Sequence, residues 1–102
     1  MNRLTLTRGG SGGATGSGYG GAIENEGTIT LTNCTLRDNF ASYGGAIDNY
    51  RGVVTLISCT LDNNFTPPNS GSGGVIDNFS GTVTLTQCTL TANSCADLGG
   101  AI

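Results

Sequence analysis

The chain has 102 residues, enough for one small domain, and 18 of them are Gly, more than twice the usual share of about 7%. Charged residues make up 11% of the chain, the formal net charge is −3 and Lys is absent, so we expect no nucleic-acid partner, because phosphate binding needs clustered Lys or Arg. No apolar stretch reaches the length of about 18 residues that a membrane span requires, so we also expect no transmembrane helix.

A four-residue motif divides the chain into repeats. Gly-Gly-Ala-Ile starts at residue 20, recurs unchanged at residues 44 and 99, and recurs at residue 73 with Val in place of Ala. After each of the first three copies come an Asn, a Gly, a short alternating run and a Cys-Thr-Leu segment, in the same order. Repeats of this length are typical of solenoids, in which each unit buries its apolar face against the next. The repeat length varies almost only in the connectors 40–43, 65–72 and 94–98, so we expect loops there.

The alternating runs at 28–32, 53–57 and 82–86 predict β-strands. Apolar residues alternate with Thr along them, β-branched residues are frequent, and good helix formers are sparse. Strands of successive repeats, stacked about 4.8 Å apart, place equivalent side chains in columns, and stacked Asn amides can hydrogen-bond along the column. The expected columns are Leu31, Leu56 and Leu85; Leu36, Leu61 and Leu90; Cys34, Cys59 and Cys88; Asn25, Asn49 and Asn78; and Asn39, Asn64 and Asn93.

These features predict an all-β fold of the parallel β-helix (solenoid) type. Residues 1–102 form a single segment of about three and a half coils, at approximately 1–19 (partial), 20–43, 44–72, 73–98 and 99–102 (partial). A propeller is less compatible, since a blade needs about 40 residues or more. The last copy is incomplete and no capping sequence follows it, so we expect a fragment without end caps, whose partners include neighbouring coils of a longer chain.

The motif Gly-Gly-Ala-Ile, followed by a short strand and Leu-x-x-Asn, resembles the repeat of the polymorphic outer membrane proteins, which is marked by Gly-Gly-Ala-Ile and Phe-x-x-Asn. The resemblance covers roughly residues 20–102, with Leu at the family's Phe position. It implies a right-handed parallel β-helix that is exported and displayed at the bacterial cell surface, outer membrane-associated or secreted, and often used in adhesion or autotransport. It implies no enzyme activity, no catalytic residues and no cofactor.

Three acids directly follow the repeated Ile and form a predicted column, Glu24, Asp48 and Asp77. Polysaccharide lyases and hydrolases of the β-helix type place acids from adjacent coils in one groove, often with calcium. Calcium prefers several oxygen ligands, and paired carboxylates can perform acid–base chemistry on glycosidic bonds. Strand alternation points Glu24 away from the core, so we favour solvated side chains over a calcium site or a catalytic site.

The four Cys come without any His, which argues against zinc. We expect the Cys column to consist of buried free thiols, and Cys95, in a connector, to be the reactive one. Outward Thr columns at 30, 55 and 84 and at 35, 60 and 89 resemble the arrays of ice-binding β-helices, although Thr is also a good exposed strand residue.

Our main hypothesis is a structural or adhesive segment of an exported bacterial surface protein, with no catalysis, cofactor or metal and with a host surface or polysaccharide as partner. The first alternative is part of a polysaccharide-active enzyme whose catalytic coils lie outside this segment. A further alternative is an ice-binding β-helix.

Overall fold

The computed structural model describes residues 5–7, 20–66 and 74–95, and these residues contain β-strands and no helix, which confirms the predicted all-β class for this part of the chain. The predicted strands at 28–32, 53–57 and 82–86 are present with these bounds. The strands are β1 (Thr5–Thr7), β2 (Ile23–Asn25), β3 (Thr28–Thr32), β4 (Thr35–Arg37), β5 (Ile47–Tyr50), β6 (Val53–Ile57), β7 (Thr60–Asp62), β8 (Phe65–Thr66), β9 (Ile76–Phe79), β10 (Thr82–Thr86), β11 (Thr89–Thr91) and β12 (Ser94–Cys95).

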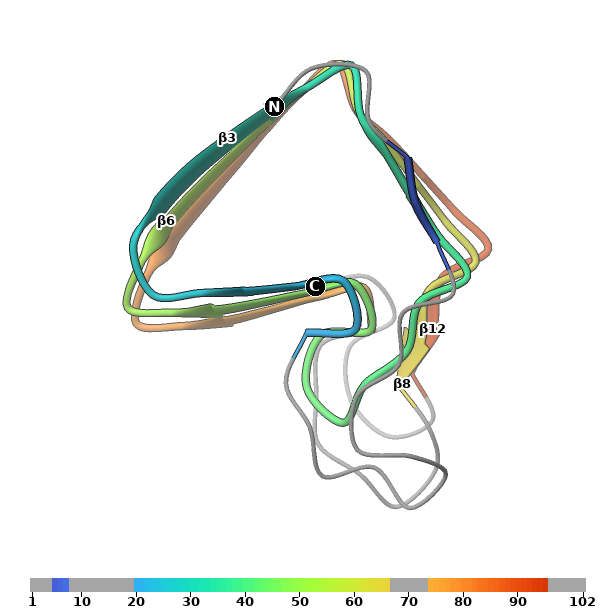
Figure 1. The fold of residues 1–102 in the computed structure, drawn as a ribbon, viewed down its shortest axis with the longest axis horizontal. Coiled ribbons are helices and arrows are strands. Elements are labelled where there is room, and N and C mark those ends of the chain that lie inside the picture. The colour runs from blue at the N-terminus through green and yellow to red at the C-terminus, as the bar shows by residue number, and fades with distance from the viewer. Residues whose placement is uncertain (1–4, 8–19, 67–73, 96–102) are drawn as a thin grey trace.

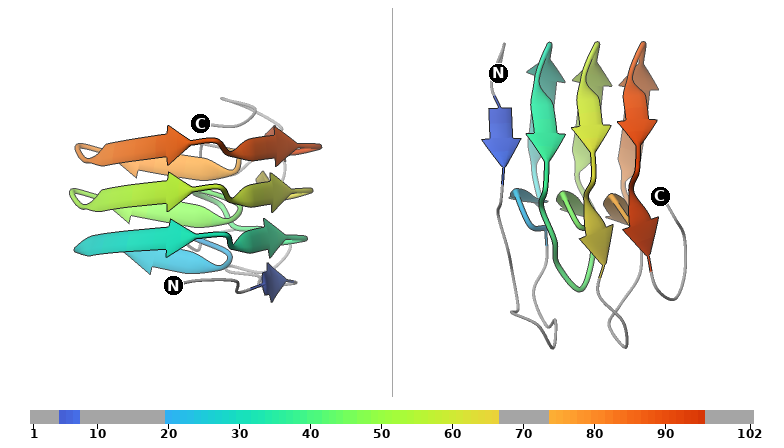
Figure 2. Two further views of the ribbon diagram at one scale, coloured as in Figure 1. Left: turned by 90° about the horizontal axis from the view of Figure 1, so that it is seen from above. Right: turned by 90° about the vertical axis from the view of Figure 1, so that its right-hand side faces the viewer.

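The strands form four parallel sheets, in each of which equivalent strands of successive repeats are neighbours. Their orders are β1-β4-β7-β11, β10-β6-β3, β12-β8 and β2-β5-β9. Seen from above, the repeats lie as layers on one another (Figure 2). In the view of Figure 1 their paths overlie one another around a roughly triangular outline, with β3 and β6 along one side. The hydrogen bonds of the sheets therefore join one repeat to the next.

The register of the sheets places like residues over one another. Leu56 pairs with Leu31 on one side and with Leu85 on the other, and Leu61 pairs likewise with Leu36 and Leu90. A slip of one residue would turn these side chains to the opposite face, so burial of the Leu columns fixes the register. The largest fully buried apolar side chains are Leu31, Leu36, Ile47, Leu56, Leu61, Ile76, Val54 and Val75.

The two glycines of the repeated motif have different physical roles. Gly20 and Gly44 have φ of 61° and 64°, in the left-handed region that side chains with a Cβ resist. The second glycine is a place of close approach instead. A Cβ on Gly45 would lie 2.5 Å from the carbonyl oxygen of Gly74 and 2.6 Å from the backbone nitrogen of Phe65. The motif therefore supplies a tight turn followed by a backbone-on-backbone contact.

The corners between strands also contain residues other than glycine in the left-handed region. Asp38, Asn63 and Ala92 occupy equivalent corners with φ of 57°, 54° and 55°. Asp and Asn tolerate this conformation better than Ala, because their short polar side chains hydrogen-bond locally. Asn63 Nδ2 donates a hydrogen bond to Asp38 Oδ1 at 2.8 Å, so this corner also carries a polar contact between repeats.

The prediction that the connectors are loops is wrong for their first residues. Phe65–Thr66 and Ser94–Cys95 are the paired strands β8 and β12, and Phe40 forms an isolated bridge with Phe65. Cys95 therefore lies at the end of a strand, half-buried, and not in a loop. The remainder of the second and third connectors, the partial coil 99–102 and most of 1–19 lie outside the described residues.

Candidate functional site

The acidic column is carried by one sheet. β5 pairs with β2 and β9 so that Asp48 lies beside Glu24 and beside Asp77. Glu24 is exposed and Asp77 half-buried, but Asp48 is only 3% exposed. The expectation that the column is solvated is therefore wrong at Asp48.

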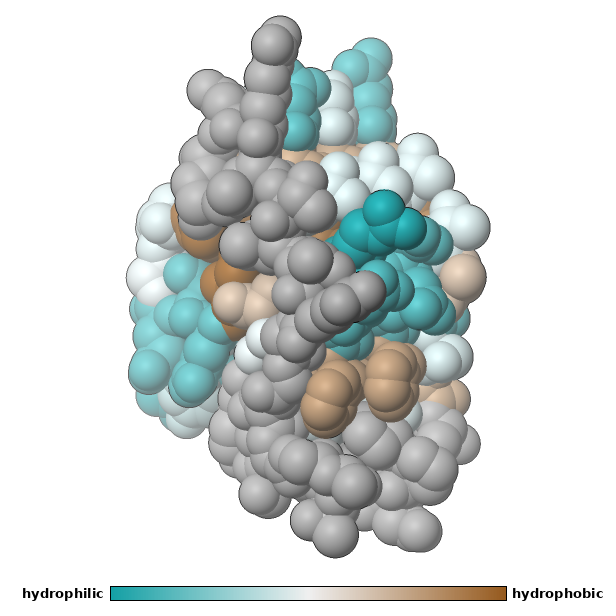
Figure 3. Space-filling view, turned by 45° about the vertical axis from the view of Figure 1, so that its right-hand side comes forward, coloured by the Kyte–Doolittle hydropathy of each residue, from teal (hydrophilic) through white to brown (hydrophobic). Residues whose placement is uncertain are grey.

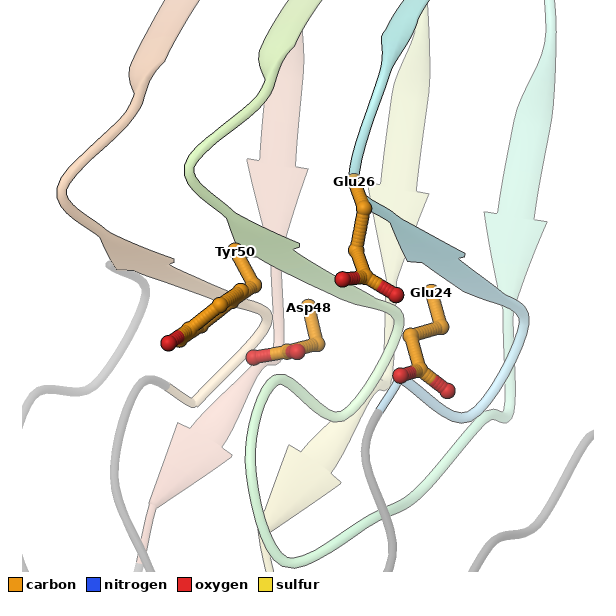
Figure 4. A pocket seen from close by; sticks show the side chains of 4 residues that line it. All are labelled: Glu24, Glu26, Asp48 and Tyr50. Atoms are coloured by element: carbon orange, nitrogen blue, oxygen red, sulfur yellow. The ribbon is translucent and has the colours of Figure 1, made fainter.

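Two open hollows adjoin Asp48. The first has a volume of about 320 Å³ and is lined by Glu24, Glu26, Asp48 and Tyr50. The carboxylates extend toward a common space beside the Tyr50 ring (Figure 4). Glu26 comes from the turn after β2, and the other three come from β2 and β5. Neighbouring repeats thus contribute together to one concave surface.

The second hollow, of about 230 Å³, lies on the other side of Asp48. It is lined by Tyr43, Asp48, Tyr50, Asp77 and Phe79. Three of its five lining residues are aromatic, and Asp48 and Tyr50 belong to both hollows. The face of the molecule drawn in Figure 3 carries hydrophilic and hydrophobic residues side by side.

Burial and neighbouring negative charge change the protonation of Asp48. Its pKa is raised from 3.8 to about 7, first because burial disfavours the charged carboxylate, and then because of a hydrogen bond to Asp77. The negative charges of Asp77, Glu24 and Glu26 act in the same direction. Near neutral pH, the Asp48 carboxyl is therefore protonated for much of the time.

This carboxyl pair differs from the usual arrangement in glycosidases. Retaining enzymes hold their two carboxyl groups about 5–5.5 Å apart and inverting enzymes hold them further apart, so that sugar or water fits between them. A direct hydrogen bond between Asp48 and Asp77 leaves no such space. Among the described residues, no group of three or more Asp, Glu, Cys or His side chains is placed to hold a metal ion.

Aromatic residues stack between repeats in two places. The rings of Tyr50 and Phe79 are 5.3 Å apart between centroids and nearly parallel, at 6°. Phe40 and Phe65 stack at 5.4 Å and 18° in a separate pair. Tyr50, Phe65 and Phe79 are exposed, at 40%, 38% and 53%, so these rings are both structural contacts and available surface.

The sequence reasoning did not identify Tyr50, Phe79, Glu26 or Tyr43 as site residues. Tyr50 and Phe79 follow the column residues Asn49 and Asn78 directly, and their strands pair them in register. Aromatic residues at the same position of two repeats could therefore have been predicted from the sequence to lie side by side. Tyr43 lies in a connector, where repeat alignment gives no positional information.

The first Asn column lies at the corner between two sheets and is hydrogen-bonded throughout. Asn25 Nδ2 donates to Asn49 Oδ1 at 2.8 Å, and Asn49 Nδ2 donates to Asn78 Oδ1 at 2.8 Å. Asn49 Nδ2 also donates to the carbonyl oxygen of Gly52 at 3.0 Å. These amides join three repeats within the protein and offer no binding site of their own.

The second Asn column has the same character. Asn39 Nδ2 donates to Asn64 Oδ1 at 3.0 Å, and Asn64 Nδ2 donates to Asn93 Oδ1 at 3.1 Å. Asn64 Nδ2 also reaches the carbonyl oxygen of Leu36 at 2.9 Å. Both Asn39 and Asn64 are fully buried, so these polar groups are satisfied within the stack.

The Cys column contacts the backbone of the preceding repeat. Cys59 Sγ donates to the carbonyl oxygen of Leu31 at 3.3 Å, and Cys88 Sγ donates to that of Leu56 at 3.3 Å. Cys34 and Cys59 are buried, Cys88 is half-buried, and none of the described cysteines forms a disulfide. Burial raises the pKa of the Cys59 thiol, so this group is a structural side chain and a poor nucleophile.

The outward Thr residues of successive repeats are aligned in columns, but the neighbouring columns of the same sheet also contain Val and Ile. Thr55 pairs with Thr30 and Thr84, whereas the neighbouring Thr28 and Thr32 pair with Val53 and Ile57. The sheet β10-β6-β3 therefore carries one continuous column of Thr between two mixed columns, which is a narrow surface for ice.

Comparisons with known proteins add no family to this picture. Neither a scan of protein-family models nor searches of curated proteins and of solved structures found a match to the chain. The resemblance to the polymorphic outer membrane proteins stays a prediction. In the part of the chain that the structure describes, no helix has the length and apolar character needed to cross a membrane.

Proposed function

We propose that the chain is a segment of a right-handed parallel β-helix in an exported bacterial surface protein, and that it acts as a structural and adhesive element without catalysis. The observation that carries this proposal is the pairing of equivalent strands of successive repeats, in parallel and in register, in all four sheets. In such a stack the interior is occupied by Leu, Cys and Asn columns, and each outer face extends as repeats are added. An extended lateral surface suits display and adhesion.

The chemistry of the outer surface supports adhesion over catalysis. Exposed aromatic rings and carboxylates lie together around the hollows beside Asp48, whereas Asp48 and Asp77, which are joined by a hydrogen bond there, lack the separation used by glycosidases. Aromatic and polar side chains around a concave surface are the usual composition of a recognition site.

Two measurements test this function. Antibodies raised against residues 20–66 should label intact cells that carry the full-length gene as strongly as permeabilised cells, and the purified protein should bind host-surface or polysaccharide material without forming a product. Labelling only after permeabilisation refutes display. Release of new reducing ends from a polysaccharide by the full-length protein refutes the non-catalytic assignment and favours the enzyme alternative.

A further inference from the structure

The strands of the third described repeat lie at one end of the stack, where β10 and β11 are the terminal members of the sheet orders β10-β6-β3 and β1-β4-β7-β11. Val83, Leu85 and Leu90 on these strands pack against the core but are only half-buried. Leu56 and Leu61, which occupy the two Leu positions in the repeat before, are fully buried. The surface formed by Val83, Leu85 and Leu90, here called the end face, therefore leaves apolar side chains partly open to solvent.

The opposite end of the stack is closed over the same Leu columns. Leu31 and Leu36, which belong to the first described repeat, are fully buried, and β1 pairs with β4 on that side. A head-to-tail contact between two copies would therefore set the end face against Leu residues that are already covered. A second copy can instead present its own end face, and contact between two identical surfaces gives a closed two-fold dimer.

The backbone of β10 determines how a second strand can pair with it. Thr82 donates a backbone hydrogen bond to Gly52 at 3.0 Å, and the carbonyl oxygen of Thr86 accepts one from the residue that follows β6. Thr82 and Thr86 thus direct their backbone groups toward β6. Because alternate residues of a strand direct these groups to opposite edges, Val83 and Leu85 direct theirs to the other edge of β10. This edge offers two residues, spaced by one, to a further strand.

We propose that the 102-residue chain forms a two-fold dimer in solution, with β10 antiparallel to β10 of a second copy and Thr84 at the centre of the pair. In this register Val83 lies opposite Leu85 of the second copy, and the two residues exchange backbone hydrogen bonds. Opposite residues of an antiparallel pair share one face of the sheet, so the two cores become continuous. The inference concerns the chain in solution and goes beyond the proposed surface function, on which it does not depend.

The composition of the third repeat suits association through this edge. Residues 76–95 contain one charged residue, Asp77, and neither Lys nor Pro. β10 pairs with β6 over its whole length, from Thr82 to Thr86, without a bulge. Proteins protect the edge strands of their sheets with charged residues, Pro or bulges, and an edge without them is a template for pairing with another chain. The second copy is therefore a partner whose hydrogen bonds and apolar side chains both match this edge.

Sedimentation equilibrium of the complete 102-residue chain tests the dimer. We expect a monomer–dimer equilibrium with a Kd on the order of 10 µM. Added NaCl should leave association unchanged or strengthen it, because each copy carries a net charge of −3 and salt screens the repulsion between them. A monomer at about 200 µM, as expected if another part of the same chain covers the end face, overturns the proposal. Association that continues beyond the dimer overturns it as well, because a two-fold contact closes.

A charge at the centre of the pair locates the interface. Thr84 is exposed, and Thr84→Lys would place two ammonium groups opposite each other across the two-fold axis, so dimerisation should weaken about tenfold or more. Thr30→Lys is the matched control, because Thr30 is exposed in the same Thr column but lies on β3, at the other end of the stack. It should change the Kd by no more than about twofold. Unchanged dimerisation of Thr84→Lys, or equal weakening by Thr30→Lys, contradicts this interface.

Crosslinking tests the two-fold arrangement even if the Lys variants do not fold, which circular dichroism establishes. In Thr84→Cys the two introduced thiols would face each other in the closely spaced, non-hydrogen-bonded pair of the antiparallel ladder. Oxidation by diamide, which takes up the two hydrogen atoms of the thiols, should therefore join them in a disulfide and give a covalent dimer. Thr30→Cys should crosslink no more than the unsubstituted chain, which measures the contribution of the native cysteines. Equal crosslinking of the two variants contradicts the proposal.

Discussion

Asn49 donates a hydrogen bond through Nδ2 to Asn78 Oδ1 at 2.8 Å, across the interface between two repeats. It also accepts one from Asn25 and is fully buried, whereas Asn78 is exposed. Loss of the amide should therefore cost more stability at Asn49 than at Asn78, because water can replace the lost hydrogen-bond partner at the exposed residue but not at the buried one.

We expect Asn49→Ala to lower the free energy of unfolding by about 3 kcal/mol, since it leaves the Asn25 donor without its amide partner and opens a buried polar corner. Asn78→Ala should cost about 1 kcal/mol. Urea denaturation followed by circular dichroism measures both. Equal losses for the two variants would mean that burial does not control the strength of this column.

Gly45→Ala should destabilise the protein by about 3 kcal/mol or more, because its Cβ would lie 2.5–2.6 Å from backbone atoms of Gly74 and Phe65, which cannot move like the end of a side chain. Gly27→Ala is the matched control. A Cβ there meets nothing within 4 Å, and the lost flexibility of the unfolded chain should leave stability unchanged or raise it by about 0.5 kcal/mol. Similar thermal midpoints for the two variants would contradict the close approach.

Ala92→Asn should stabilise the protein by about 1 kcal/mol. Ala92 has φ of 55°, which costs a residue with a Cβ about 1 kcal/mol and which Asn tolerates better. The new amide would also continue the exposed polar corner of Asp38 and Asn63. Thr91→Asn, one residue earlier on strand β11, is the control and should be neutral or slightly destabilising. Differential scanning calorimetry compares them, and a fall in midpoint for Ala92→Asn would refute the explanation.

Stability should decrease as pH rises from about 4 to above 7. The pKa of Asp48 is about 7 in the folded protein and 3.8 ordinarily, so between these two values the folded state binds more protons than the unfolded state. The free energy of unfolding therefore falls as the pH rises through this interval and the carboxyl ionises. Each unit of pKa difference corresponds to about 1.4 kcal/mol, and solvent screening at the open hollows reduces the total to about 2 kcal/mol.

The Asp48→Asn substitution should flatten the pH dependence of the free energy of unfolding. The Asp62→Asn substitution should keep it, because Asp62 lies near Arg37 on another sheet. Unfolding in urea at a series of pH values measures the slope. An unchanged slope in Asp48→Asn would assign the pH dependence to other groups.

The strands and their register were predictable because one physical requirement, burial of the Leu columns, repeats at fixed positions. Leu31, Leu56 and Leu85 define the faces of β3, β6 and β10 without any further information. The strand pair β8 and β12 was not predictable in this way. Its residues, Phe65–Thr66 and Ser94–Cys95, differ in type, so only their shared backbone path brings them together.

The site was harder to predict than the fold. Alternation along β5 gives the direction of Asp48 but not its burial, which depends on what closes over the outside of the sheet. Tyr43 reaches the second hollow from a connector, and the raised pKa of Asp48 depends on charges from three repeats. These are properties of side chains converging in space, and no single repeat contains them.

The in-register backbone pairing between repeats also bears on how such a protein changes over generations. Tandem duplication of one repeat in the gene would insert a further layer whose Leu and Asn side chains already match both new neighbours, with the added length set by the strand spacing of about 4.8 Å. Unequal recombination can therefore alter the reach of the molecule while its cross-section stays constant.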